Sequence, residues 1–235
     1  MKRALSAFVL FVFALSLSAL AAGQNATPQD TAHQSAAGQD QAPGLDDQLF
    51  DAVEKGDTAA IEKLLVQGAD ANAQGPTGAT PLIVATAMGN LDVVKLLLDK
   101  GAKIDTTDNR GESALHYAAM TGSVEEAKLL LDKGANVEIK GGSSLTPLML
   151  SIVSGSTDLV KLLLDHGANV EAKDKNGFTS LMAASGGGLT DVAKALLDHG
   201  ANVNDKSNDG TTALSLAVSQ KHPDVEALLR AKGAQ

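Results

Sequence analysis

The chain has 235 residues, with 19 lysines and arginines against 28 aspartates and glutamates, and its formal net charge is −9. So acidic a protein is repelled by nucleic acid and by anionic membrane surfaces, and neither is predicted as a partner. Because the sequence contains no cysteine, disulfide bonds and thiolate metal sites are excluded, and burial of apolar surface must hold the fold together.

The first 21 residues have the pattern of a secretory signal peptide. Lys2 and Arg3 precede an apolar run over residues 4–20, and Ala19 and Ala21 are the small residues that a signal peptidase requires. We therefore predict cleavage after Ala21 and export to the periplasm or to the medium. An uncleaved membrane anchor is the alternative, because the apolar run is near the shortest length that spans a bilayer.

Residues 22–44 are predicted to be a disordered spacer. The segment is rich in Gln, Ala, Asp and Pro and lacks an apolar period, so it buries too little surface to offset the entropy lost on ordering. Without the signal peptide the chain has 17 basic and 28 acidic residues, a net charge of −11, and only Phe50, Tyr117 and Phe178 as aromatic residues. So few rings argue against a base-stacking or sugar-binding platform, and so acidic a chain is not predicted to contact a membrane after cleavage.

From residue 45 onward the chain repeats itself every 33 residues. The dipeptide Gly-Ala recurs at positions 68, 101, 134, 167, 200 and 233. A fixed period of this size is typical of stacked structural units. It predicts six units, at about residues 45–73, 74–107, 108–140, 141–173, 174–206 and 207–235.

The unit at residues 108–140 predicts two helices joined by a tight turn. Ser113 stands at the N-cap of a first helix that ends at Gly122, where its hydroxyl can accept from an otherwise unpaired amide. A second helix, from about Val124 to Lys133, contains three consecutive leucines. Gly134 follows it, where a left-handed C-cap is needed. Each unit is therefore expected to be a helix-turn-helix pair.

The motifs of this unit resemble those of the ankyrin repeat family. They are the opening Ser113-Ala114-Leu115-His116 and the ending Gly134-Ala135-Asn136. The resemblance covers about residues 45–235 and implies an all-α solenoid of six helix-turn-helix units. The chain departs from the family pattern at residues 141–144, where Gly-Gly-Ser-Ser replaces the usual Asp-x-x-Gly turn.

The two ends of the array are predicted to be polar caps, because the terminal repeats of a solenoid turn one face to water. Asp51 and Lys63 replace residues that are apolar in the middle units. At the other end Glu226 and Arg230 do the same, and their spacing allows an i,i+4 ion pair. We therefore expect the array to end at these residues.

No catalytic site, metal site or cofactor is predicted. Ser113, His116 and Asp108 could be read as a nucleophile with its base and acid, but no oxyanion-hole or nucleophile-elbow pattern accompanies them. In the family that the segment resembles, the hydroxyl and imidazole at these positions tie the turn to the helix. His166 and His199 occupy the same place in successive units, but helices stacked about 8–10 Å apart hold them too far apart to share one metal ion.

The resemblance implies protein binding through the turn tips and the exposed face of the first helices. Five apolar residues fall at such positions in adjacent units: Met88, Met120, Leu145, Val153 and Phe178. We predict that they form one apolar patch with a polar rim, made of Arg110, Glu112, Lys175 and Asn176. The alternative is that these apolar side chains fold down onto their own turns.

The leading prediction for function is an exported, non-catalytic and monomeric scaffold that binds a protein partner with a rigid groove. A secreted effector that binds a host protein is the first alternative. An enzyme with an unrecognised site is the second, and it would require polar side chains that converge on a deep pocket.

Overall fold

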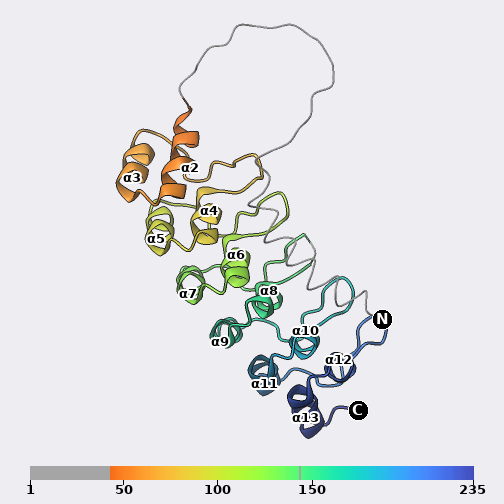
Figure 1. Ribbon diagram of the computed structural model, residues 1–235. Coiled ribbons are helices and arrows are strands. Elements are labelled where there is room, and N and C mark those ends of the chain that lie inside the picture. Colours follow the sequence, from red (N-terminus) through yellow and green to blue (C-terminus); the bar gives the residue numbers. More distant parts are fainter. Residues whose placement is uncertain (1–42, 143) are drawn as a thin grey trace, which may run out of the picture. The chain divides into compact units, whose positions relative to one another are not determined.

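The computed structural model describes residues 43–142 and 144–235. The predicted signal peptide and nearly all of the predicted spacer lie outside the described residues. Residues Gly44–Gln235 form one compact unit. In this part of the chain there are twelve helices in six pairs and no extended strand, so the all-α solenoid expected from the sequence is confirmed (Figure 1).

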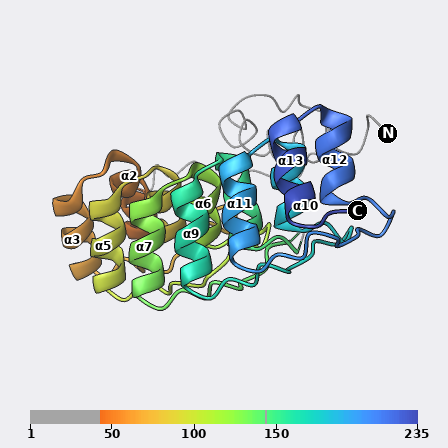
Figure 2. The same ribbon diagram turned by 90° about the horizontal axis from the view of Figure 1, so that it is seen from below.

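The helices stack in two rows (Figures 1 and 2). The first helix of each pair lies on the side of the inter-unit turns: α2 (Leu45–Lys55), α4 (Pro81–Ala87), α6 (Ala114–Thr121), α8 (Pro147–Ser154), α10 (Ser180–Gly186) and α12 (Ala213–Gln220). The second helices form the other row: α3 (Thr58–Val66), α5 (Leu91–Asp99), α7 (Val124–Asp132), α9 (Thr157–Asp165), α11 (Thr190–Asp198) and α13 (Pro223–Ala231). Each helix packs against its own partner and its row neighbours, as α6 does against α7, α4 and α8. None of the described helices is both long and apolar enough to cross a membrane.

Short-range chemistry decides where the helices begin and end. Thr80, Thr146 and Thr179 cap α4, α8 and α10, each accepting the backbone N–H of the residue three positions on. These hydroxyls satisfy amides that no helical carbonyl can reach. After each second helix a glycine adopts a left-handed conformation, as Gly134 does with a φ of 91°. A side chain would be strained there, which explains why the Gly-Ala markers recur.

One leucine position forms the centre of the second row. Leu97, Leu130, Leu163 and Leu196 are 0% exposed, and they are separated by 33 residues each. A buried leucine side chain contributes about 1.5–3 kcal/mol relative to an exposed one. A continuous column of such residues therefore supplies the cohesion that a cysteine-free chain needs.

Polar side chains also tie each unit to the next. In five successive steps a side-chain oxygen accepts the backbone N–H of the residue 31 positions later, at donor–acceptor distances of 2.6–3.0 Å. The accepting residues are Asn72, Asp105, Glu138, Glu171 and Asn204. These bonds fix neighbouring loops relative to one another, so the row of turns is held in one arrangement.

The second helices carry a ladder of ion pairs on their exposed ends. Lys133 Nζ lies 2.9 Å from Asp99 Oδ1, and Lys232 Nζ lies 3.0 Å from Asp198 Oδ1. At the two steps between them, His166 faces Asp132 and His199 faces Asp165. The lysines before the Gly-Ala markers at residues 134 and 233 therefore meet a carboxylate of the preceding unit as well as the negative end of their own helix, and the two histidines occupy the equivalent place.

Both predicted caps are polar in the structure. Asp51 and Lys63 are exposed, and Asp51 pairs with Lys55 at 2.5 Å. At the other end the predicted pair is confirmed, with Arg230 Nε 2.9 Å from Glu226 Oε1.

Candidate functional site

The five apolar residues predicted for one patch differ in their exposure. Met88 is 55% exposed at the end of α4 and Val153 is 40% exposed on α8, whereas Met120 and Phe178 are half-buried. Leu145 is only 5% exposed. The prediction that the scaffold leaves Leu145 exposed is therefore wrong, and Met88 and Val153 remain as the strongly exposed members.

The burial of Leu145 follows from a contact with the preceding unit. His116 Nε2 lies 3.2 Å from the Leu145 carbonyl oxygen, and that oxygen also accepts the N–H of Gly141. These bonds hold the end of the turn against α6, and the Leu145 side chain is enclosed there. Replacing Leu145 by a polar residue would therefore perturb the core and could not report on partner binding alone.

The residues predicted for the polar rim also differ in their exposure. Lys175 and Asn176 are exposed at their turn. Arg110 and Glu112 are only partly exposed, because they turn toward Asp108 and His116. We call Asp108, Arg110, Glu112, His116 and Tyr117 the Asp108 cluster.

The carboxylate of Asp108 is the centre of this cluster, and its side chain is 1% exposed. Oδ1 accepts the backbone N–H groups of Arg110 and Glu112, each at 2.9 Å. Oδ2 accepts from the Tyr117 hydroxyl at 2.8 Å and from Arg110 Nε at 3.4 Å, and the Arg110 guanidinium also donates to the Tyr117 oxygen. Burial, together with Asp108, raises the pKa of Tyr117 to about 12. The buried charge of Asp108 is thus compensated by a cation and by hydrogen bonds.

Glu112 is the unsatisfied member of the cluster. Burial and the charge of Asp108 raise the pKa of Glu112 to about 7, against the opposing effect of Arg110. Its Oε2 atom is buried without a hydrogen-bond partner and lies 3.6 Å from His116 Nε2. The neighbouring Gly141 leaves it room, since a Cβ atom there would come within 2.4 Å of Glu112 Oε1.

His116 fastens the beginning of α6. Its Nδ1 accepts the backbone N–H of Ser113 at 3.0 Å and lies 3.0 Å from the Ser113 hydroxyl, while Nε2 faces the Leu145 carbonyl. This set of partners fits a neutral ring with its proton on Nε2. Burial lowers the pKa of His116. Because Ser113 and His116 are both 0% exposed, a substrate cannot reach this pair.

The two histidines considered for a metal site are occupied by other contacts. Nδ1 of His166 lies 2.8 Å from the Leu162 carbonyl, and Nδ1 of His199 lies 2.8 Å from that of Ala195. Their Nε2 atoms face aspartates of the ladder. In the described ranges no group of three or more His, Asp or Glu side chains is placed to hold a metal ion.

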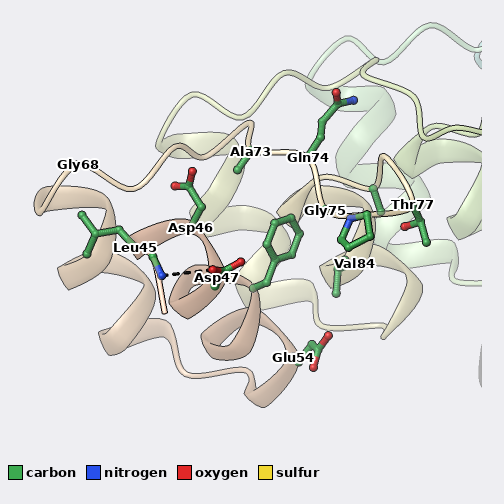
Figure 3. Close-up of a pocket in the computed structure, with 14 residues that line it drawn as sticks. Leu45, Asp46, Asp47, Glu54, Gly68, Ala73, Gln74, Gly75, Thr77 and Val84 are labelled. Carbon is green, nitrogen blue, oxygen red and sulfur yellow. Dashed lines mark hydrogen bonds between the residues drawn. The ribbon is translucent and has the colours of Figure 1, made fainter. Parts of the chain in front are cut away.

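A pocket that was not predicted from the sequence lies at the N-terminal end of the array. It has a volume of about 930 Å³ and lies between α2 and the first inter-unit turn (Figure 3). Its apolar lining includes Phe50 and Val84, and its acidic lining consists of Asp46, Asp47 and Glu54. Positions 46, 50 and 54 are four residues apart, so they share one face of a helix. This four-residue spacing is the feature of the sequence that could have indicated a shared acidic and apolar helix face. We call this pocket the α2 pocket.

The repeat register explains why the pocket is open. Four residues at the first turn lie 33 positions before members of the Asp108 cluster. They are Gly75, Thr77, Ala79 and Val84, equivalent to Asp108, Arg110, Glu112 and Tyr117, and all four line the pocket. The large polar side chains of the Asp108 cluster are thus replaced by small ones. The following unit contacts the first turn through Asn109, which donates its N–H to the Thr77 carbonyl at 2.9 Å.

The stacked helix pairs, their Gly-terminated second helices and the row of linked turns define a helical repeat protein. A family model described as ankyrin repeats (3 copies) matches residues 49–141 and 148–235, which is most of the chain. The chain therefore belongs to the ankyrin repeat family. Ankyrin repeats are generally protein–protein interaction modules. No curated protein matches the chain.

Proposed function

We propose that the protein is a non-catalytic, monomeric scaffold that binds a protein partner through its turn tips and first helices. The observation that carries this proposal is the exposure of Met88 at the end of α4 and of Val153 on α8, in a row of first helices whose connecting loops are tied together by hydrogen bonds between units. A preorganised surface loses little entropy on binding, and methionine adapts to an apolar partner surface.

Cross-linking tests this proposal directly. A photoreactive amino acid at position 88 is expected to form a covalent adduct with a partner in the source cells. The matched control is position 66, because Val66 is 85% exposed on α3, in the other row. Adducts from position 66 but not from 88 or 153 would reject the turn side as the binding surface.

We also propose export, with cleavage after Ala21. The support is the basic start, the apolar run and the small residues of the sequence. Cell fractionation and the mass of the purified chain test it together, since cleavage removes the first 21 residues. A full-length chain in the cytoplasm would contradict the proposal. Recovery from the medium instead of the periplasm would favour the effector alternative, in which the partner is a host protein.

A further inference from the structure

We propose that the α2 pocket binds a basic peptide segment of a partner protein, with one large apolar side chain of that segment inserted against Phe50 and Val84. The inference rests on the proposed function, and it adds the chemistry of the partner.

The size and lining of the pocket suit an inserted side chain. Its volume of about 930 Å³ is within the range of pockets that enclose small ligands. Phe50 and Val84 are half-buried, while Leu45 and Pro76 are exposed on its wall. The Phe50 ring packs against the first turn, with Cζ 3.6 Å from the point that a Cβ on Gly75 would occupy. An apolar anchor would therefore cover a ring that is now partly open to water, as a binding hot spot requires.

The charge of the lining selects a cationic partner. The residues that line the pocket include three acids and no lysine, arginine or histidine. Asp46 accepts the backbone N–H of Asp70, and Asp47 accepts that of Gly44, while Glu54 makes no ion pair within the described residues. Within residues 43–142 and 144–235, none of the three carboxylates has a cationic partner, unlike the aspartates of the ladder on the second helices. A cation held beside them would gain attraction without displacing an existing one.

The distribution of charge along the array strengthens this selection. Residues 44–99 contain nine acids and three bases, whereas residues 100–235 contain seventeen acids and fourteen bases. About two thirds of the net negative charge thus lies in the first third of the array. A surface of one sign raises the local concentration of oppositely charged segments and speeds their association.

The same charge argues against two other occupants. The preceding part of the chain, residues 23–42, contains Asp30 and Asp40 but no lysine or arginine. A second copy brings a net charge of −9 as the full chain, or −11 without the signal peptide. Each would add negative charge to an acidic pocket, so an external basic segment is the favoured ligand.

Synthetic peptides test the proposal with the purified protein and fluorescence anisotropy. The probe is an amidated hexapeptide with Arg-Lys before and Lys-Arg after a central Phe-Leu pair. Two control peptides change one property each: the first replaces the four bases by acids, and the second replaces Phe-Leu by Gly-Gly. We expect saturable binding of the probe alone, weakening as salt is raised from 0.05 to 0.5 M, since salt screens the charges at the rim. Equal binding of the acidic or the Gly-Gly peptide would overturn the proposal.

Two matched variants assign the binding to the pocket. The variant Asp46→Asn/Asp47→Asn/Glu54→Gln keeps the accepting oxygens and removes three charges, and we expect it to weaken binding about tenfold. The control variant Asp158→Asn/Asp191→Asn/Asp224→Asn removes three exposed charges from the first turns of α9, α11 and α13. Equal weakening by both variants would show attraction to the net charge alone and would reject the pocket.

The outcomes for the pocket and for the scaffold can be told apart. Adducts from position 88 without binding of the basic probe would retain the scaffold and reject this pocket ligand. Concentration-dependent self-association that the pocket variant abolishes would assign the pocket to a second copy, and would also overturn the proposal.

Discussion

The first inter-unit turn and the Asp108 cluster occupy the same place in two successive units, yet one is open and the other is filled. Around the buried carboxylate of Asp108, the Arg110 guanidinium and the Tyr117 phenol form hydrogen bonds with it and with each other. At the first turn, Gly75, Thr77 and Val84 leave a pocket of about 930 Å³. The backbone of the repeat tolerates both arrangements. A few positions per unit therefore decide whether a turn stabilises the array or offers a binding surface.

The largest expected effect is on the free energy of unfolding, which should fall far more when the Asp108 cluster is changed than when the first turn is changed. Asp108→Ala removes the acceptor of two backbone N–H groups and leaves Arg110 without its carboxylate, so we expect the free energy of unfolding to fall by about 3 kcal/mol. Gly75→Ala changes the equivalent position, where a Cβ makes only ordinary contact with Phe50, and is expected to cost less than about 1 kcal/mol. Urea unfolding followed by circular dichroism measures both. Similar losses of unfolding free energy in the two variants would show that the two turns do not differ in their contribution to stability.

The pH dependence of stability provides the next test of the filled turn. Because the folded state raises the pKa of Glu112 from 4.5 to about 7, it binds more protons than the unfolded state in that window. The contribution of Glu112 to stability is therefore present below pH 4.5 and is lost as the pH rises through 7. Glu112→Gln removes this loss, so we expect the variant to exceed the parent protein by on the order of 2 kcal/mol at pH 8 and by little at pH 4.5.

Other groups of the cluster contribute to that profile in both proteins. The lowered pKa of His116 acts in the opposite direction, since its contribution is lost as the pH falls below the unfolded value. Asp108 and Arg110 face Glu112 in both proteins as well. The difference between the two pH profiles thus reports Glu112 together with its contact with His116, and a difference that is constant from pH 4.5 to 8 would contradict the assignment.

Transferring side chains of the Asp108 cluster to the first inter-unit turn tests whether the open pocket is needed to bind the basic probe. The variant Gly75→Asp/Thr77→Arg/Val84→Tyr places the equivalents of Asp108, Arg110 and Tyr117 at the first turn. We expect its side chains to occupy the pocket and weaken binding of the basic probe at least about tenfold, or about 1.4 kcal/mol. Anisotropy measures the affinity and thermal unfolding checks the fold. Unchanged affinity in a folded variant would show that the pocket is not where the probe binds.

The smallest effect is expected at the turn that follows the Asp108 cluster. Ser144 has a φ of 61°, whereas the equivalent positions hold Gly111 and Gly177 with φ values of 81° and 78°. A serine is strained in this conformation, so Ser144→Gly is expected to raise the free energy of unfolding by about 0.5–1 kcal/mol. The reverse change Gly177→Ser is expected to lower it by more than this, because a Cβ there would also come within 2.9 Å of the Asn208 backbone nitrogen. A destabilising Ser144→Gly would mean that the hydroxyl makes a compensating contact.

Much of the fold could be predicted because its causes are local. The N-cap at Ser113, the C-cap at Gly134 and the pair of Glu226 with Arg230 each depend on residues a few positions apart. The site was less predictable. Leu145 was expected to be exposed, but the structure buries it, with its carbonyl oxygen 3.2 Å from Nε2 of His116, 29 residues earlier.

The sequence by itself determined the period, the number of units, the helix ends and the acidic character of the N-terminal end, because each depends on residue types and spacings along the chain. Only the tertiary structure decided that Arg110 and Glu112 turn inward while Thr77 and Ala79 line a pocket. The physical reason is that side chains at one register position meet different neighbours in each unit. Whether they pack together or leave space depends on volumes and charges contributed by residues distant in sequence.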